Sequence, residues 1–291
     1  MMMPMTNTNE AIATFLNLIE QLGPQKILAE FTDGFCPRGQ VQLNDETRMV
    51  LTLNVPPETD AYDASRVQLA GCENQFIVAS EPADDEVQME TFWRLVFESN
   101  AVNVIYLENY VKDRPCKFVP WTQETKDYRK MTVAKKKVAV VKSDAQALLE
   151  VLPEGCSNSV IVRFIQPVGM ELSPEATMRK RLLYVTRTLR DDKGISVIVC
   201  SDGLSKSAMF VFLHVIITKL NANVNTTMAD ILGELRSARC GAVQTEEQYF
   251  TLYILVMDYI EQKYPSFKKK CGDLKKTLQA FWRGYSASLV K

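Results

Sequence analysis

The chain has 291 residues, of which 46% are hydrophobic and 24% are charged, and its formal net charge is −1. This composition is typical of a soluble globular protein, and nothing in the overall charge favours nucleic acid or a membrane surface as a partner. The longest apolar run, Ala208 to Ile217, is too short to cross a bilayer, which needs about 20 residues.

Cysteine and histidine usage limits the cofactors and the compartment that we expect. The seven cysteines are scattered and form no C-x-x-C pair, which is typical of reduced thiols in a cytoplasmic protein. The N-terminal residues MMMPMTNTNE lack a basic region followed by an apolar one, so we expect no secretory signal. With His214 as the one histidine, we predict no metal site and no other cofactor, and we expect His214 itself to be a core or interface residue and not a catalyst.

Hydrophobic spacing predicts alternating elements in the first part of the chain. Residues 9–22 have the apolar period of a helix that ends at Gly23-Pro24, and residues 31–63 are expected to be irregular. Further elements are predicted in this order: short strands at 67–69 and 76–79, a helix at 90–98, a buried strand at 102–107, an alternating strand at 133–142 and a strand at 159–165.

The second part of the chain is predicted to be mainly helical. A basic amphipathic helix at 176–189 leads to a β-branched strand at 195–199. Helices are then predicted at 208–220, 228–239, 246–264 and 274–285. Strands interleaved with helices indicate one α/β domain, with a central mixed, twisted sheet flanked by helices.

We divide the chain into a disordered N-terminus at 1–10, one domain at 11–266 and a basic C-terminal helix or tail at 267–291. The C-terminal segment places lysines beside apolar residues, a pattern that can bind an anionic membrane surface. A helix that packs on the domain and leaves its basic face in water is the favoured interpretation.

The most informative segment is Ile195 to Met209, where a strand, a short loop and an apolar helix follow one another. Backbone N–H groups that converge at a helix N-terminus bind anions and can lower the pKa of a cysteine. The segment therefore predicts an anion-binding loop with a thiol. The loop residues are Cys200, Ser201, Asp202, Gly203, Leu204, Ser205, Lys206 and Ser207.

Four segments resemble the protein tyrosine phosphatase domain and follow its order. YDASRVQL (62–69) resembles the family's YDHSRVxL, and ETFWRLVFESNAVNVIYL (90–107) resembles its DFWRMVWE…VIVML. The loop 200–207 stands where the family has its signature, His-Cys-Ser-x-Gly-x-Gly-Arg-Ser/Thr, and RCGAVQTEEQYFTLYILVMDYI (239–260) resembles its glutamine loop. Together they span most of residues 54–264 and imply the fold of a single phosphatase-like domain.

The resemblance also implies roles for individual residues. In the family, a cysteine thiolate removes a phosphoryl group from tyrosine, and Cys200 stands at the nucleophile position. Ser207 stands where a hydroxyl bonds that thiolate. Gln244 and Gln248 stand where glutamines position the hydrolytic water.

The signature loop departs from the family at four positions. Lys206 replaces the arginine that clamps the phosphoryl group, and a lysine has no bidentate fork. Loss of a comparable donor lowers a rate by about 10²–10³-fold. Val199 replaces the family's histidine, and Ser205 replaces a glycine. Asp202 replaces a small residue, and an inward-facing carboxylate there would repel phosphate and raise the pKa of the thiol.

The general acid and the recognition loop are also altered. The family's Trp-Pro-Asp aligns with residues 168–170, which are VGM, and general-acid catalysis is worth about 10²–10⁴-fold. Glu171 is the adjacent carboxyl group that could act in its place, although a shift of one residue changes its direction and reach. The tyrosine that stacks on phosphotyrosine falls on Pro56, whereas Glu58 stands where an aspartate holds a substrate N–H.

These joint losses predict a catalytically inactive, phosphatase-like protein that acts as a binding, scaffold or competitor module in phosphotyrosine or kinase signalling. The expected partner is a protein, such as a phosphotyrosine-containing kinase or its substrate. One alternative is a weak phosphatase that uses Cys200, Lys206 and an acid at Glu171 or Asp202. Redox sensing through Cys200 ranks last, because Asp202 opposes a thiolate. The predicted ligand-binding residues are the loop 200–207, Gln244, Gln248 and Glu58.

Overall fold

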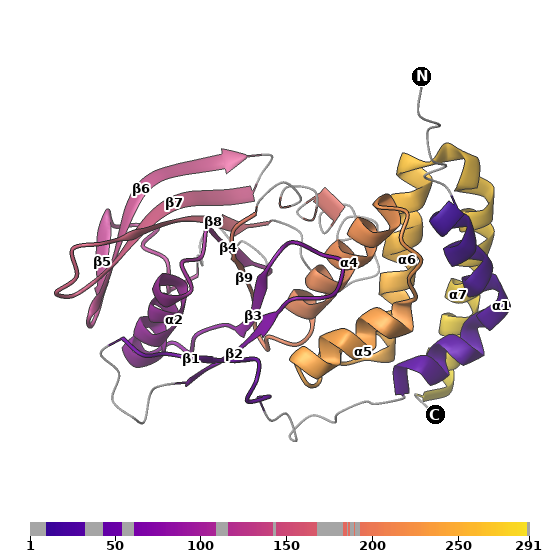
Figure 1. The fold of residues 1–291 in the computed structure, drawn as a ribbon, viewed down its shortest axis with the longest axis horizontal. Helices are drawn as coiled ribbons and strands as arrows, with labels where there is room; N and C mark the ends of the chain where they lie inside the picture. Colours follow the sequence, from indigo (N-terminus) through magenta and orange to yellow (C-terminus); the bar gives the residue numbers. More distant parts are fainter. Residues whose placement is uncertain are drawn as a thin grey trace.

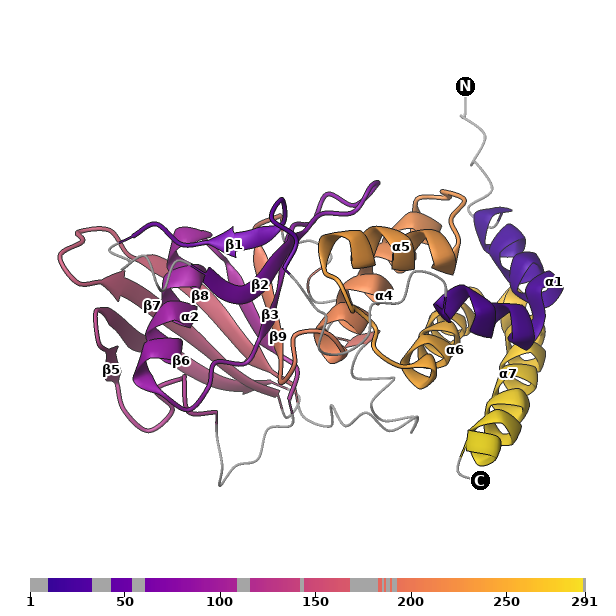
Figure 2. The ribbon, with the colours of Figure 1, turned by 90° about the horizontal axis from the view of Figure 1, so that it is seen from below.

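The structure is a computed structural model that describes residues 10–32, 43–53, 61–108, 116–141, 144–167, 183–184, 186, 189 and 193–289. Within these residues, one mixed sheet of nine strands has the order β1-β2-β3-β9-β4-β8-β7-β6-β5 (Figures 1 and 2). The strands are β1 (Arg48–Val50), β2 (Ala61–Val67), β3 (Phe76–Ser80), β4 (Asn103–Tyr106), β5 (Thr125–Tyr128), β6 (Met131–Val141), β7 (Asp144–Pro153), β8 (Val160–Gln166) and β9 (Ser196–Cys200). The predicted α/β fold with a mixed sheet is confirmed.

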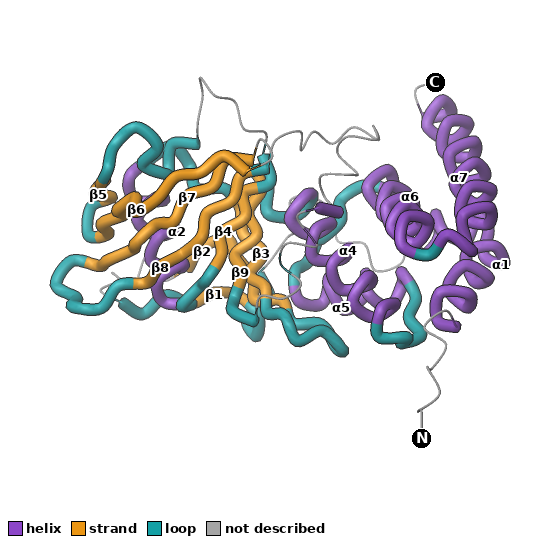
Figure 3. Tube along the Cα trace, turned by 90° about the horizontal axis from the view of Figure 1, so that it is seen from above, coloured by secondary structure: helices purple, strands orange, loops and turns teal. Residues whose placement is uncertain are grey.

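Helices lie on both sides of the sheet (Figure 3). They are α1 (Glu10–Thr32), α2 (Glu86–Glu98), α4 (Lys206–Asn221), α5 (Met228–Ala238), α6 (Glu246–Lys263), the short 3₁₀ helix η2 (Pro265–Phe267) and α7 (Lys268–Leu289). Helix α2 packs on one face, and α4 and α5 pack on the other. Helix α6 lies against α4, while α1 and α7 form the outermost layer of the helical end (Figure 2).

Two hydrophobic clusters fill the two sides of the sheet. On the α2 side, Trp93 is fully buried, and its Nε1 donates to the carbonyl oxygen of Phe118 at 2.8 Å. On the other side, Phe210 of α4 belongs to the cluster that contains Ile198 of β9. All five residues of β9 are buried, because a central parallel strand is covered on both faces.

The central sheet is parallel where it positions the candidate site. Strand β9 pairs in parallel with β3 on one side and with β4 on the other, and β4 pairs in parallel with β8. The carboxyl ends of β3, β9 and β4 therefore meet at one edge. This edge is the usual place for a ligand site in such a sheet.

Most predicted elements are confirmed, with shifted ends. The predicted end of the first helix at Gly23-Pro24 is confirmed, since Gly23 takes the non-helical angles φ 67° and ψ 166°; a second helical part of α1, which was not predicted, continues to Thr32. Proline is tolerated in the first turn of a helix, so Pro24 can begin this second part. Helix α2 begins four residues earlier than predicted, because the Asp85 side chain caps it by accepting from the Gln88 N–H.

Several strands were not predicted or were misplaced. The segment 31–63 contains β1, and the strand predicted at 67–69 is instead β2, which ends at Val67. Strand β7 buries alternate residues, yet its alanines, glutamine and glutamate have low strand propensity. The helix predicted at 176–189 lies mostly outside the described residues.

Candidate functional site

The candidate site lies where β9 ends and α4 begins. Cys200 is the last residue of β9, and Lys206 is the first residue of α4, so the loop occupies residues 201–205. The strands on both sides are tied to it: the Glu81 N–H donates to the Cys200 carbonyl at 2.8 Å, and the Leu107 N–H donates to the Val199 carbonyl at 2.8 Å. The predicted strand–loop–helix arrangement is confirmed.

The Cys200 thiol is fully buried and contacts Ser207, as the resemblance implies. Its Sγ lies 3.1 Å from the Ser207 Oγ, and the Ser207 N–H donates to it at 3.4 Å. The Asp202 Oδ1 lies 3.2 Å from the same sulfur. Burial raises the pKa of the thiol, and the Asp202 charge raises it further, against the lowering effect of Ser207. The thiol is therefore the favoured form at neutral pH.

The Asp202 carboxylate accepts hydrogen bonds from three donors of the loop. Its Oδ1 accepts from the backbone N–H groups of Leu204 and Ser205, each at 2.9 Å. Its Oδ2 accepts from the Ser205 hydroxyl at 2.5 Å, so this N-cap side chain does not cap α4. Burial favours a higher pKa for Asp202, but these donors outweigh burial and hold its pKa below the ordinary value. A negative charge here is also favoured by the N-terminus of α4.

A second carboxylate, Glu108, binds the two ends of the loop. Its Oε2 lies 2.5 Å from the Lys206 Nζ, and its Oε1 accepts from the Ser201 N–H at 3.0 Å. Both side chains are largely buried, with 13% of Lys206 and 21% of Glu108 exposed. Lys206 is thus paired with the protein's own carboxylate. Glu108 was not predicted; its one signal is its place directly after a buried strand.

Gly203 and Arg239 position the loop against the neighbouring strands. Gly203 has φ +61°, and a Cβ on it would lie 2.6 Å from the Ser80 backbone nitrogen. Arg239 is 1% exposed; its Nε donates to the Gly203 carbonyl at 3.3 Å, and its Nη2 lies 2.8 Å from the Asp63 Oδ1. Arg239 thus connects the loop to Asp63 of β2, a role that the sequence motif alone did not indicate.

The two glutamines belong to the segment beside the loop. The Val243 N–H donates to the Leu204 carbonyl at 2.9 Å, which joins that segment to the loop. The Gln248 Oε1 accepts from the Gln244 backbone N–H at 2.8 Å, and the Gln248 N–H is capped by the Thr245 Oγ1 at 3.2 Å. The structure therefore brings the glutamine segment and the loop together.

Other predicted residues lie elsewhere or outside the described part. Glu58, Pro56, Glu171 and residues 168–170 are outside the described residues. His214 is a core residue, as predicted: it is 1% exposed, and its Nε2 lies 2.9 Å from the Asn74 Oδ1. In the described ranges, no group of three or more His, Cys, Asp or Glu side chains is placed to hold a metal ion. None of the described helices combines the length and the apolar character needed to span a membrane.

Alkylation of Cys200 by iodoacetamide is expected to be slow at neutral pH and to rise above the ordinary thiol range, because the raised pKa keeps the sulfur protonated. The Asp202→Asn variant removes the nearby charge, so it should react faster at the same pH. Mass spectrometry of the Cys200 peptide across a pH series measures both rates, with the half-buried Cys156 as the internal reference. A wild-type rate already at its plateau at pH 7 would contradict this assignment.

Comparison with known proteins agrees with this geometry. The sequence profile of the family described as protein-tyrosine phosphatase matches residues 36–258. Human receptor-type tyrosine-protein phosphatase epsilon is 25% identical over 233 residues, which cover 74% of this chain and 32% of that protein. Mouse receptor-type tyrosine-protein phosphatase alpha is 23% identical over 228 residues, covering 74% of this chain and 27% of that protein.

A third relative, mouse tyrosine-protein phosphatase non-receptor type 20, is 21% identical over 233 residues that cover 75% of this chain and 51% of that protein. The chain therefore spans about a quarter to a half of the length of these relatives. The family match covers well over half of the chain, including the loop at 200–207 and the glutamine segment. The chain belongs to the protein-tyrosine phosphatase family, with one such domain.

Proposed function

We propose that this chain is a catalytically inactive, phosphatase-like binding module that acts as a scaffold or competitor in phosphotyrosine or kinase signalling. One observation carries the proposal: the Asp202 carboxylate accepts the loop N–H groups of Leu204 and Ser205 and lies 3.2 Å from the Cys200 sulfur. A phosphoryl group would need those same donors. It would also meet the repulsion of a carboxylate that stays ionised.

The charge balance of the loop supports the same proposal. Lys206, at the position of the family's arginine, is paired with Glu108 at 2.5 Å. A phosphoryl group would have to displace that carboxylate and would gain a point charge instead of a bidentate fork. Together with a protonated Cys200, these features disfavour the two parts that the family's reaction needs, a thiolate nucleophile and a bidentate clamp on the phosphoryl group.

A weak, atypical cysteine-dependent phosphatase is the second candidate. It is favoured by the retained contact of 3.1 Å between Cys200 and Ser207. In this case Cys200 attacks and Lys206 neutralises charge. Glu171 supplies the proton, because the donors around Asp202 keep that carboxylate ionised. The cytoplasm is the proposed location, supported by the free thiols of the described cysteines.

Calorimetric titration with a phosphotyrosine peptide and its unphosphorylated form, with turnover assayed on the same sample, separates these candidates. We expect no turnover near ordinary enzyme rates of about 1 s⁻¹ or more, and no preference for the phosphorylated peptide. The Cys200→Ser variant is the control for any residual signal. Turnover that Cys200→Ser abolishes would favour the weak phosphatase, whereas turnover that survives it comes from a contaminant.

A further inference from the structure

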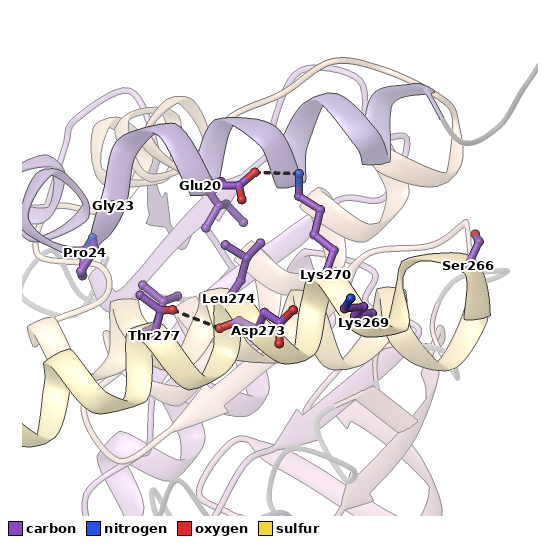
Figure 4. Close-up of a pocket in the computed structure, with 11 residues that line it drawn as sticks. Glu20, Gly23, Pro24, Ser266, Lys269, Lys270, Asp273, Leu274 and Thr277 are labelled. Atoms are coloured by element: carbon purple, nitrogen blue, oxygen red, sulfur yellow. Dashed lines mark hydrogen bonds and ion pairs between the residues drawn. The ribbon is translucent and has the colours of Figure 1, made fainter.

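Helices α1 and α7 run side by side at the outer end of the molecule (Figure 2). An open hollow of about 470 Å³ lies between them (Figure 4). Ile19 and Pro24 line it from α1, and Leu274 and Leu278 line it from α7. The bend of α1 at Gly23, where φ is 67°, marks one end of the hollow. Its volume is within the range of about 300–1,000 Å³ that is usual for ligand sites.

A second hollow of about 280 Å³ lies between α6 and α7. It is lined by Phe250 and Ile254 of α6 and by Trp282 of α7, and Leu278 lines both hollows. Helix α7 is thus flanked by two depressions: the α1–α7 hollow has both apolar and charged walls, and the α6–α7 hollow is mostly apolar. Each can accept a large apolar side chain from a segment that lies along or across α7.

The exposed surface of α7 is cationic. Four exposed side chains have no ion pair within the described part of the chain: Lys268, Lys269, Lys276 and Arg283. The other two lysines are paired: Lys270 with Glu20 at 2.9 Å, across the hollow in Figure 4, and Lys275 with Asp258 at 2.7 Å. Two exposed carboxylates oppose these cations without an ion pair in these ranges: Asp273 lines the α1–α7 hollow, and Glu247 lines the α6–α7 hollow.

We propose that this surface, with its two hollows and its four free cations, is the docking site for an acidic amphipathic segment of a partner protein. The partner's apolar side chains would fill the hollows, as in helix-in-groove recognition, and its carboxylates would lie against Lys269, Lys276 and Arg283. The inference rests on the proposed function, because it names the surface through which a non-catalytic module binds.

The geometry favours a peptide over a membrane. Cys271 and Leu278 of α7 are buried against the domain, so its apolar side is not free to insert into a bilayer. A bilayer surface meets the exposed ammonium groups but does not fill concave hollows between helices. A nucleic acid would likewise use the charges and leave the half-buried apolar side chains of Leu274 and Trp282 uncovered.

The test selects peptides from a displayed library of random 16-residue sequences on the full chain. We expect the enriched peptides to be net acidic with at least two large apolar residues. Their binding should fall about tenfold or more in the Lys269→Glu/Lys276→Glu variant and should weaken with salt. The Thr277→Trp variant, which fills the α1–α7 hollow from an exposed position, should also lose binding while the charges stay.

The matched control is Lys130→Glu/Lys137→Glu, which reverses two exposed lysines far from α7, one in the turn between β5 and β6 and one in β6. Thermal unfolding of each variant excludes loss of fold. Enriched peptides that bind wild type and the Lys269→Glu/Lys276→Glu variant equally, no enrichment at all, or binding only to phosphatidylserine vesicles would overturn the proposal. Phosphotyrosine turnover on the same preparation reports separately on the proposed function.

Discussion

Replacing Asp202 with alanine is expected to convert the loop into a site that binds inorganic phosphate. The change frees the N–H groups of Leu204 and Ser205 and removes the charge 3.2 Å from the Cys200 sulfur. Phosphate should then bind at least tenfold more tightly than to the wild type, a gain of about 1.4 kcal/mol or more. Thermal unfolding with increasing phosphate measures it, because a ligand that binds only the folded chain raises the melting temperature.

The Asp202→Asn variant is the control that separates two effects of the carboxylate: its occupation of the loop N–H groups and its negative charge. Its amide oxygen can still accept from the loop donors, so it should remove the repulsion without opening the site. We expect phosphate to stabilise Asp202→Ala clearly more than Asp202→Asn. If phosphate shifts the melting temperature of Asp202→Ala no more than that of the wild type, the carboxylate is not what keeps the anion out.

Gly203→Ala is expected to destabilise the fold by about 3 kcal/mol or more, since a left-handed backbone and a close contact are both penalised. Gly203 has φ +61°, and its added Cβ would lie 2.6 Å from the Ser80 nitrogen and 2.8 Å from the Arg239 Nη2. The first of these atoms is backbone and is held in the sheet by β3. Urea unfolding, with the slope checked for constancy, gives the difference in free energy.

Gly233→Ala is the matched control for this prediction. Gly233 lies inside α5, and a Cβ there would have no neighbour within 4 Å. Alanine is favoured over glycine in a helix by about 1 kcal/mol, so this variant should be more stable than the wild type. Equal effects of the two substitutions would contradict the tight packing of the loop against β3.

The fold could be predicted where one segment carries its own signal. The β-branched run that became β9 and the long apolar helix α4 are examples, because burial on all sides demands a continuous apolar sequence. Strands β1 and β5 have three and four residues, and each lies at an edge of the sheet. Their extended conformation depends on pairing with another strand, and the hydrophobic pattern within such a short segment does not predict that pairing.

The candidate site was predictable where a motif carried it, in the loop and in the glutamine segment, and not where a single residue arrives from another strand. The sequence predicted what an inward-facing Asp202 carboxylate would do but left its orientation open, and the structure shows that it faces inward. Glu108 is 98 residues from Lys206 in sequence and becomes its partner because β4 and β9 are adjacent parallel strands. Strand order was needed to find that pair, and spacing along the chain does not contain it.

The two internal carboxylates have a consequence for how this loop behaves over time. In an ordinary phosphate-binding loop, the backbone N–H donors have hydrogen-bond acceptors only while an oxyanion is bound. Here Asp202 and Glu108 satisfy the N–H groups of Leu204, Ser205 and Ser201 from within the chain. We therefore expect the loop to keep the same backbone shape with and without phosphate, because its described donors are already satisfied within the chain.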